Sequence, residues 1–221
     1  FIEVTLAKTV LVTGSNRGMG LEFVSQYAEK GWDVIATSRS PSDDNDLINL
    51  AKANPNIQIE KMDVTNVNEI LSLADKYENQ SIDLLINNAG MSGDRANQAW
   101  GQIDKKEFEK LMSINAFGAL KVSEAFSKNI STSEEKKIVS ISSVAGSISS
   151  MGRPSSLPIL SISKAALNMA MKTIALRLKD DGVTVILMNP GAVDTRALRQ
   201  AFGLSLEEAE KATNFDYKGY P

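Results

Sequence analysis

Residues 9–20 read Thr9-Val-Leu-Val-Thr13-Gly14-Ser15-Asn16-Arg17-Gly18-Met19-Gly20. The first five residues are β-branched or apolar and predict a buried strand, and the glycines that follow predict a tight turn into a helix. Gly14 permits the turn, Gly18 lets the backbone approach a ligand, and Gly20 removes a side chain where helix meets strand. Backbone N–H groups at the positive end of such a helix bind a diphosphate. A glycine-rich turn without any ligand is the alternative, and the place of the turn in the fold decides between the two.

Short apolar segments recur along the chain, and longer segments of helical periodicity separate them. The predicted strands cover residues 9–13, 33–37, 57–61, 82–86, 137–141 and 183–187. Spacings of three and four, as in Leu21, Val24 and Ala28, indicate amphipathic helices between them. Short, mostly apolar strands are typical of a parallel sheet that is buried on both faces. We therefore expect one α/β domain over residues 1–221, with a Rossmann-like doubly wound parallel sheet in three α/β/α layers.

The composition excludes several chemistries. The 221 residues include neither histidine nor cysteine. A Ser-His-Asp triad, a thiol nucleophile, a disulfide and a zinc site with nitrogen or sulfur ligands are therefore all ruled out, and we expect no metal centre. The chain has 24 Lys and Arg against 27 Asp and Glu, and its net charge of −3 argues against nucleic acid or an anionic membrane as a partner.

No targeting or membrane segment is evident in the sequence. No uninterrupted apolar run approaches the roughly 18 residues of a membrane span. Residues 1–8 include Glu3 and lead directly into the first predicted strand, which is unlike a signal peptide. We expect a soluble cytoplasmic protein.

The end of the second predicted strand indicates which dinucleotide binds. Ser38 and Arg39 lie there, where an NAD-binding domain often places an acidic residue for the ribose hydroxyls. A second cation, Arg17, lies in the glycine turn. Two guanidinium groups suit an adenosine 2′-phosphate, so NADP(H) is the expected cofactor. Two solvated surface arginines are the alternative.

Together, these features resemble the short-chain dehydrogenase/reductase family from Thr9 to about Thr195. Further motifs of the family are matched, in order, by Asp63-Val64, Asn87-Asn88-Ala89-Gly90, Asn115, Ser142-Ser143-Val-Ala-Gly146 and Pro190-Gly191-Ala-Val193-Asp-Thr195. The resemblance implies that the cofactor is held by Gly14, Ser15, Asn16, Arg17, Gly18, Met19, Gly20, Ser38, Arg39, Asp63, Val64, Asn88, Ala89, Gly90, Lys164, Pro190, Gly191, Val193 and Thr195. The segments that contain Ser143 and Lys164 are similar to those of sniffer and C-factor-like carbonyl reductases.

The resemblance also implies catalytic roles for Asn115, Ser143 and Lys164. In the family, the serine hydrogen-bonds the substrate carbonyl, the asparagine supports a water relay, and the lysine binds the nicotinamide ribose and lowers the pKa of a tyrosine. That tyrosine stands four residues before the lysine, where this chain has Leu160. The chain's tyrosines are at positions 27, 77, 217 and 220. Leucine transfers no proton, and loss of a general acid typically costs about 10²–10⁴ in rate.

Three functions follow from this site. The first is an NADP(H)-dependent oxidoreductase that interconverts carbonyl and alcohol groups, with low or altered activity because of Leu160. The second is a non-catalytic NADP(H)-binding protein that acts as a sensor or interaction partner. The third is a hydrolase with a Ser143–Lys164 dyad. Ser143 could instead cap a turn, and Asn115 lies in a helical segment that its residue type disfavours.

Two expectations concern assembly and the end of the chain. The helices that carry Asn115 and Lys164 resemble those by which relatives dimerise, so we expect a homodimer or homotetramer. Relatives place a substrate lid and a further strand after the position of Thr195, and we expect a shortened lid after about residue 196. Within it, the capping pair Ser205 and Glu208 predicts a short helix, and residues 214–219 predict a final strand.

Overall fold

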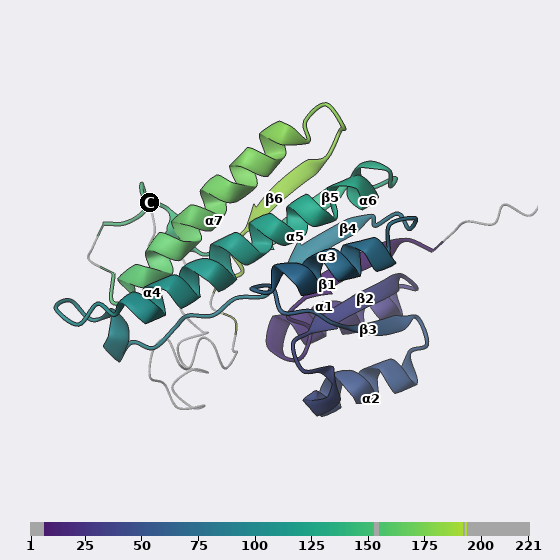
Figure 1. Cartoon of the computed structure of the whole chain (residues 1–221), viewed down its shortest axis with the longest axis horizontal. Helices are drawn as coiled ribbons and strands as arrows, with labels where there is room; N and C mark the ends of the chain where they lie inside the picture. Colours follow the sequence, from purple (N-terminus) through teal and green to yellow (C-terminus); the bar gives the residue numbers. More distant parts are fainter. Residues whose placement is uncertain (1–6, 153–154, 192, 194–221) are drawn as a thin grey trace, which may run out of the picture.

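A single sheet of six parallel strands forms the centre of the protein, with helices on both faces (Figure 1). The computed structural model describes residues 7–152, 155–191 and 193. The strands are β1 (Thr9–Thr13), β2 (Asp33–Ser38), β3 (Ile57–Lys61), β4 (Leu84–Asn87), β5 (Lys137–Ile141) and β6 (Thr184–Met188). Their order in the sheet is β3-β2-β1-β4-β5-β6. The predicted doubly wound α/β fold is confirmed, although β4 begins at Leu84 rather than at residue 82.

The helices alternate with the strands as predicted. They are α1 (Gly18–Glu29), α2 (Asn45–Ala53), α3 (Val67–Lys76), α4 (Lys105–Met112), α5 (Ala119–Ala125), α6 (Ser127–Ser131) and α7 (Pro158–Arg177). Short 3₁₀ turns are η1 (Pro41–Asp43), η2 (Ala96–Gln98) and η4 (Val144–Gly146), and a π-helical turn, η3 (Ser113–Gly118), joins α4 to α5. Because α4, η3 and α5 follow one another without a gap, they form one long helix with a local insertion (Figure 1).

Alternate residues of each central strand face opposite layers, and this alternation builds two cores. In β1, Leu11 packs with α3, α5 and α7, whereas Val10 and Val12 pack with α1 and α2. The fully buried Phe126, which directly follows α5, belongs to the first core. Burial on both faces explains why β1 has consecutive apolar residues at its centre instead of an alternating pattern.

Helix α7 bears on the expectation that no segment of the chain could span a membrane. By length and composition alone, this helix is long and apolar enough to cross one. The sequence shows no uninterrupted apolar run here because Lys164, Lys172 and two serines separate the apolar residues. In the structure α7 packs against η3, η4, α5 and β6, and its Lys164 is buried.

The sheet reverses its strand order beside β1. The chain runs from β1 outward through β2 to β3 and then returns to β4 on the other side of β1. In such sheets ligands bind in the crevice at the carboxyl ends of the two strands that flank this reversal. The turns after β1 and β4 meet there. Thr195, the shortened lid, the short helix around Ser205 and the final strand at residues 214–219 all lie outside the described residues.

Candidate active site at the carboxyl edge of the sheet

The glycine turn after β1 is locked against the segment after β4. Gly14 has a positive φ of +67°, and a Cβ on Gly20 would stand 2.1 Å from the carbonyl oxygen of Gly14. The Asn88 side-chain amide donates hydrogen bonds to the carbonyls of Thr13 (2.9 Å) and Gly14 (3.1 Å). The N–H groups of Asn88 and Ala89 both donate to Thr13 Oγ1 at 3.0 Å. Positions 14 and 20 therefore require glycine, and position 88 requires a side chain that can donate both hydrogen bonds, as asparagine does.

The turn presents a helix end that can receive an anion. Helix α1 begins at Gly18, and no side chain caps it. The N–H groups of its first turn can therefore donate hydrogen bonds to another partner. Ser15, predicted to bind the cofactor, is buried instead. Its hydroxyl donates to the carbonyl of Val12 (2.9 Å) and its N–H to that of Thr37 (2.9 Å). Its side chain thus fixes the turn, whereas Met19 is half-buried on the first turn of α1.

Two arginines and an aspartate surround the outer side of this turn. Arg17 and Arg39 are exposed, and within the described residues neither guanidinium has an ion-pair or hydrogen-bond partner. Asn16 Nδ2 donates to Asp44 at 3.2 Å, and Ser38 Oγ donates to the other oxygen of the same carboxylate. The segment at residues 40–46 therefore folds back, through η1 and the start of α2, onto the predicted cofactor residues.

The Asp63–Val64 pair follows β3 at the same edge of the sheet. Asp63 Oδ1 accepts hydrogen bonds from the N–H (2.8 Å) and the hydroxyl (2.7 Å) of Thr65. Val64 is buried against Gly118, whose Cβ, if present, would stand 2.9 Å from the Val64 side chain. The aspartate shapes the turn and the valine packs against η3.

Asn115 lies on the π-helical turn, where the extra residue directs its side chain inward. Its Nδ2 donates to the carbonyl of Met91 and to Ser163 Oγ, each at 2.9 Å. Its Oδ1 accepts from the N–H of Met91, also at 2.9 Å. The side-chain amide therefore pins the segment after β4 to α7. Such π insertions occur often at functional sites.

The side chains of Lys164 and Asn115 both lie against Gly90. A Cβ on Gly90 would stand 3.3 Å from Asn115 Oδ1 and 3.5 Å from Lys164 Nζ, so the glycine lies against both side chains. Lys164 Nζ donates to the carbonyl of Ile141 at 2.7 Å. Burial lowers the pKa of the Lys164 ammonium to about 8. Because a buried ammonium is costly to leave unpaired, a polar group that binds beside Gly90 would be stabilised by a hydrogen bond from Lys164.

Leu160 is held at the predicted proton-donor position by its backbone. Its N–H donates to Gln98 Oε1 at 2.9 Å, and its carbonyl accepts from Ser163 Oγ at 2.8 Å. Its side chain is half-buried and apolar. Ser143 caps a turn, which is one of the two roles that the sequence suggests for it. Its hydroxyl accepts a hydrogen bond from the N–H of Ala145 (3.1 Å) at the start of η4.

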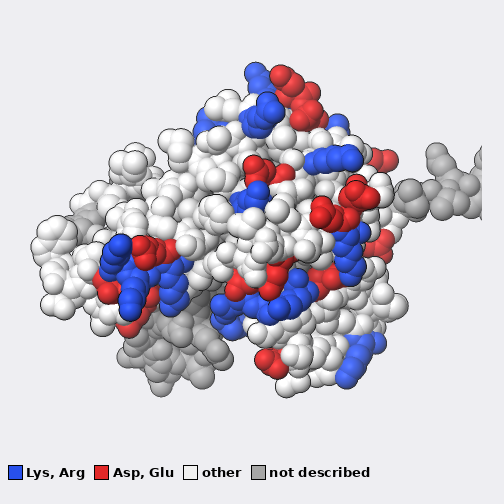
Figure 2. All heavy atoms as spheres, viewed as in Figure 1, with Lys and Arg blue, Asp and Glu red and all other residues white. Residues whose placement is uncertain are grey.

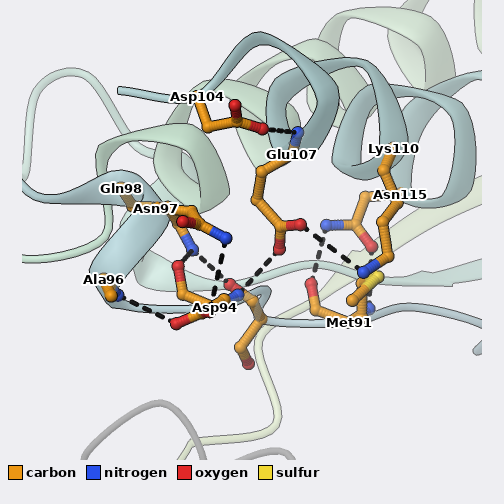
Figure 3. Close-up of polar contacts among 10 residues, drawn as sticks. Met91, Asp94, Ala96, Asn97, Gln98, Asp104, Glu107, Lys110 and Asn115 are labelled. Carbon is orange, nitrogen blue, oxygen red and sulfur yellow. Dashed lines mark hydrogen bonds and ion pairs between the residues drawn. The ribbon is translucent and has the colours of Figure 1, made fainter. Parts of the chain in front are cut away.

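Sequence analysis missed a polar network that supports this site (Figure 3). The fully buried Gln98 donates to the carbonyls of Ser92 (2.8 Å) and Asp94 (3.3 Å) besides accepting from Leu160. The buried Glu107 accepts from the N–H of Asp94 at 2.7 Å and lies 3.4 Å from Lys110 Nζ. The network fastens the loop after β4 to α4 and α7. Only its bond from Gln98 to Leu160 joins distant parts of the sequence, and neither Gln98 nor Glu107 belongs to a recognisable motif.

An apolar cavity of about 880 Å³ opens beside the first turns of α7. Its lining includes Trp100, Ile148, Met151 and Ile162, and Ser155 and Ser161 supply hydroxyls. The predicted catalytic residues Ser143 and Lys164 do not line it. Among the described residues, the cavity therefore lies beside Ser143 and Lys164 and does not contact them.

The last predicted segment follows β6 at the same edge. Pro190 is half-buried, while Gly191 and Val193 are exposed, and the N–H of Gly191 donates to Asn189 Oδ1 at 3.3 Å. Gly191 has a positive φ of +72°, which explains the glycine. The structure thus gathers the segments that contain the described predicted residues along one edge, with Ser15 turned into the core. Their functional roles stay predictions.

Comparison with known proteins points to one family. The profile described as short chain dehydrogenase matches residues 8–203. The short chain dehydrogenase gsfK of Penicillium aethiopicum is 33% identical over 94% of this chain and 82% of its own length. A short-chain dehydrogenase/reductase from Burkholderia multivorans, solved with bound NADP, superposes with a TM-score of 0.80 at 30% identity, covering 87% of this chain and 82% of that one. An NADPH-bound carbonyl reductase from chicken fatty liver gives a TM-score of 0.78 at 30% identity, covering 86% and 78%.

Burial of Lys164 predicts a pH-dependent term in stability. The pKa of this ammonium is about 8 in the folded protein against 10.5 in the unfolded chain, so the unfolded state binds more protons between these values. The free energy of unfolding of the ligand-free protein should therefore rise across this pH range, relative to that of Lys164→Met, by on the order of 3 kcal/mol. Urea unfolding of both proteins at pH 7, 8, 9 and 10 measures the difference. Parallel curves would contradict the buried ammonium.

Proposed function

Because the chain belongs to the short chain dehydrogenase family, we propose that it is an NADP(H)-dependent oxidoreductase that interconverts carbonyl and alcohol groups, with activity lowered or altered by Leu160. The observation that carries this proposal is the meeting of Asn115 and Lys164 at Gly90, beside an uncapped helix end. The carbonyl-reductase substrate class and the sniffer-like branch are part of the proposal. A non-catalytic NADP(H)-binding protein is the second candidate, and the absence of a proton donor at Leu160 favours it.

The donor set at the carboxyl edge suits a phosphorylated dinucleotide. The first-turn N–H groups of α1 would hold the diphosphate. Arg17 and Arg39, without partners in the described part of the chain, would hold the adenosine 2′-phosphate. Lys164 would bind the nicotinamide ribose, and its exchange of Ile141 for a ribose hydroxyl would relieve part of the cost of burial. When bound, the nicotinamide supplies or accepts a hydride.

The protein's own residues divide the remaining tasks. Ser143 would orient the substrate carbonyl by donating its hydroxyl proton to it while still accepting from the N–H of Ala145, and Asn115 keeps the wall beside it rigid. Proton delivery to the carbonyl oxygen then falls to water or to the Lys164 ammonium, because Leu160 has no transferable proton. A hydrolytic Ser143–Lys164 dyad is disfavoured, since Lys164 donates to Ile141 and Ser143 to no lysine among the described residues.

Association through the helices that carry Asn115 and Lys164 is also part of the proposal. Phe117 on η3 and Met169 on α7 are 44% and 68% exposed, so both present apolar surface that a second copy of the chain would cover. We expect a homodimer or homotetramer in the cytoplasm. On the face drawn in Figure 2, basic and acidic side chains are intermixed, which fits a small-molecule substrate better than nucleic acid or a membrane.

Cofactor choice is tested by calorimetric titration with NADPH and NADH. The unmutated protein should bind NADPH more tightly, and Arg39→Ala should weaken NADPH binding about tenfold to a hundredfold, because charge-assisted hydrogen bonds are lost. NADH binding should change little. The matched control is Arg177→Ala, an exposed arginine at the far end of α7. Equal affinities for the two cofactors in the unmutated protein would contradict the NADP(H) proposal.

Restoring a phenol separates the two candidate functions. Leu160→Tyr should raise the rate of NADPH oxidation with a panel of aldehydes and ketones by about 10²–10⁴. Leu160→Phe supplies the same ring without a hydroxyl and should give no gain. If neither variant gains activity while both still bind NADPH, the non-catalytic protein is the correct function.

Introducing a charge on the exposed helix surface should dissociate the oligomer. Phe117→Glu and Met169→Glu should each shift the mass measured by light scattering at micromolar concentration to that of a monomer, because a buried unpaired carboxylate is costly. Leu71→Glu, at a 40% exposed leucine on α3, is the control and should leave the mass unchanged. A monomeric unmutated protein would contradict the proposed assembly.

A further inference from the structure

We propose that Asp44 limits the preference for NADP(H) by opposing the 2′-phosphate of this cofactor and favouring an unphosphorylated ribose. The inference rests on the proposed function, because it concerns the same adenosine site. Under it, the two arginines and Asp44 act against each other, and the measured preference for NADP(H) is smaller than the arginines alone would give.

The Asp44 carboxylate bridges the two segments that form the adenosine site. Asn16 Nδ2, in the glycine turn, donates to one of its oxygens at 3.2 Å. Ser38 Oγ, at the carboxyl end of β2, donates to the other. The residue is half-buried between η1 and α2, so these hydrogen bonds fix the carboxylate in place rather than leaving it to sample solvent.

The two anchors of this carboxylate directly precede the two arginines. Asn16 is followed by Arg17 and Ser38 by Arg39, and neighbouring Cα atoms are about 3.8 Å apart. Neither arginine forms an ion pair with Asp44 among the described residues. Any group that both guanidiniums grip is therefore held close to a fixed negative charge that they do not neutralise.

The consequence differs between the two kinds of ribose. A 2′-phosphate is a dianion, and a carboxylate a few ångströms away repels it. A free 2′-hydroxyl is a hydrogen-bond donor, which a carboxylate accepts well. Asp44, between η1 and α2, thus supplies the acidic group that β2 lacks at its end, where Ser38 and Arg39 stand.

Nearby acidic residues provide a matched control. Asp46, two residues along the chain and exposed in the first turn of α2, makes no hydrogen bond or ion pair with another described residue. Asp44→Asn and Asp46→Asn remove the same charge from the same segment and keep the side-chain shape. A general electrostatic effect of the segment would appear in both variants, whereas a direct effect on the adenosine site appears only in the first.

Calorimetry with nucleotide fragments tests the inference without any activity. The probes are adenosine 2′,5′-bisphosphate and adenosine 5′-monophosphate, titrated into the unmutated protein and both variants. Asp44→Asn should bind the bisphosphate about threefold to tenfold more tightly and should not bind the monophosphate more tightly. Asp46→Asn should match the unmutated protein for both probes.

Each other result has a distinct meaning. Equal tightening in both variants would overturn the specific role of Asp44, as would no change in either. Weaker binding of both probes to Asp44→Asn, with a lower melting temperature, would show that the residue only holds the turn, and would also overturn the inference. If the unmutated protein binds neither probe at millimolar concentration, the proposed NADP(H) function itself fails.

Discussion

Asn88 donates its side-chain amide to the carbonyls of Thr13 and Gly14, and these hydrogen bonds join the turn after β1 to the turn after β4. The two strands are neighbours although two strands and three helices separate them in the sequence. Their contact fixes where α1 points its uncapped end and where Gly90 meets Asn115 and Lys164. The rest of the site is built outward from this junction, because a shift of one turn would separate the proposed phosphate-binding and catalytic groups.

Local patterns in the sequence predicted the sheet, the order of its helices and the edge at which the site lies. They succeed because strands such as β1 are buried on both faces and because Gly14 and Gly20 occupy positions that other residues would obstruct. They fail where a contact joins distant segments. The bridge made by Asp44 does not follow from residue type, since it depends on which side chains of the glycine turn and of β2 approach the carboxylate. The role of Gln98 cannot be predicted from the sequence for the same reason, because its partner Leu160 lies on a distant helix.

Leu160 shows how a site can keep its framework while its chemistry changes. Gln98 and Ser163 hold the backbone of this residue on both sides, and neither hydrogen bond involves its side chain. The support of the position is therefore independent of the group that it presents. Lys164, by contrast, depends on its surroundings, because burial lowers its pKa and only a polar partner offsets that cost.

The π-helical turn at η3 has a consequence for the long helix that contains it. One extra residue in a helical repeat advances everything downstream by about 100° around the axis. Upstream of the insertion Leu111 is buried, and downstream Val122 and Phe126 are buried against the sheet. Rewinding these six residues as a regular α-helix, with none deleted, would rotate those two side chains out of the core. The π-helical turn thus sets the rotation of the downstream helix about its axis. Both the inward position of Asn115 and the burial of Val122 and Phe126 depend on it.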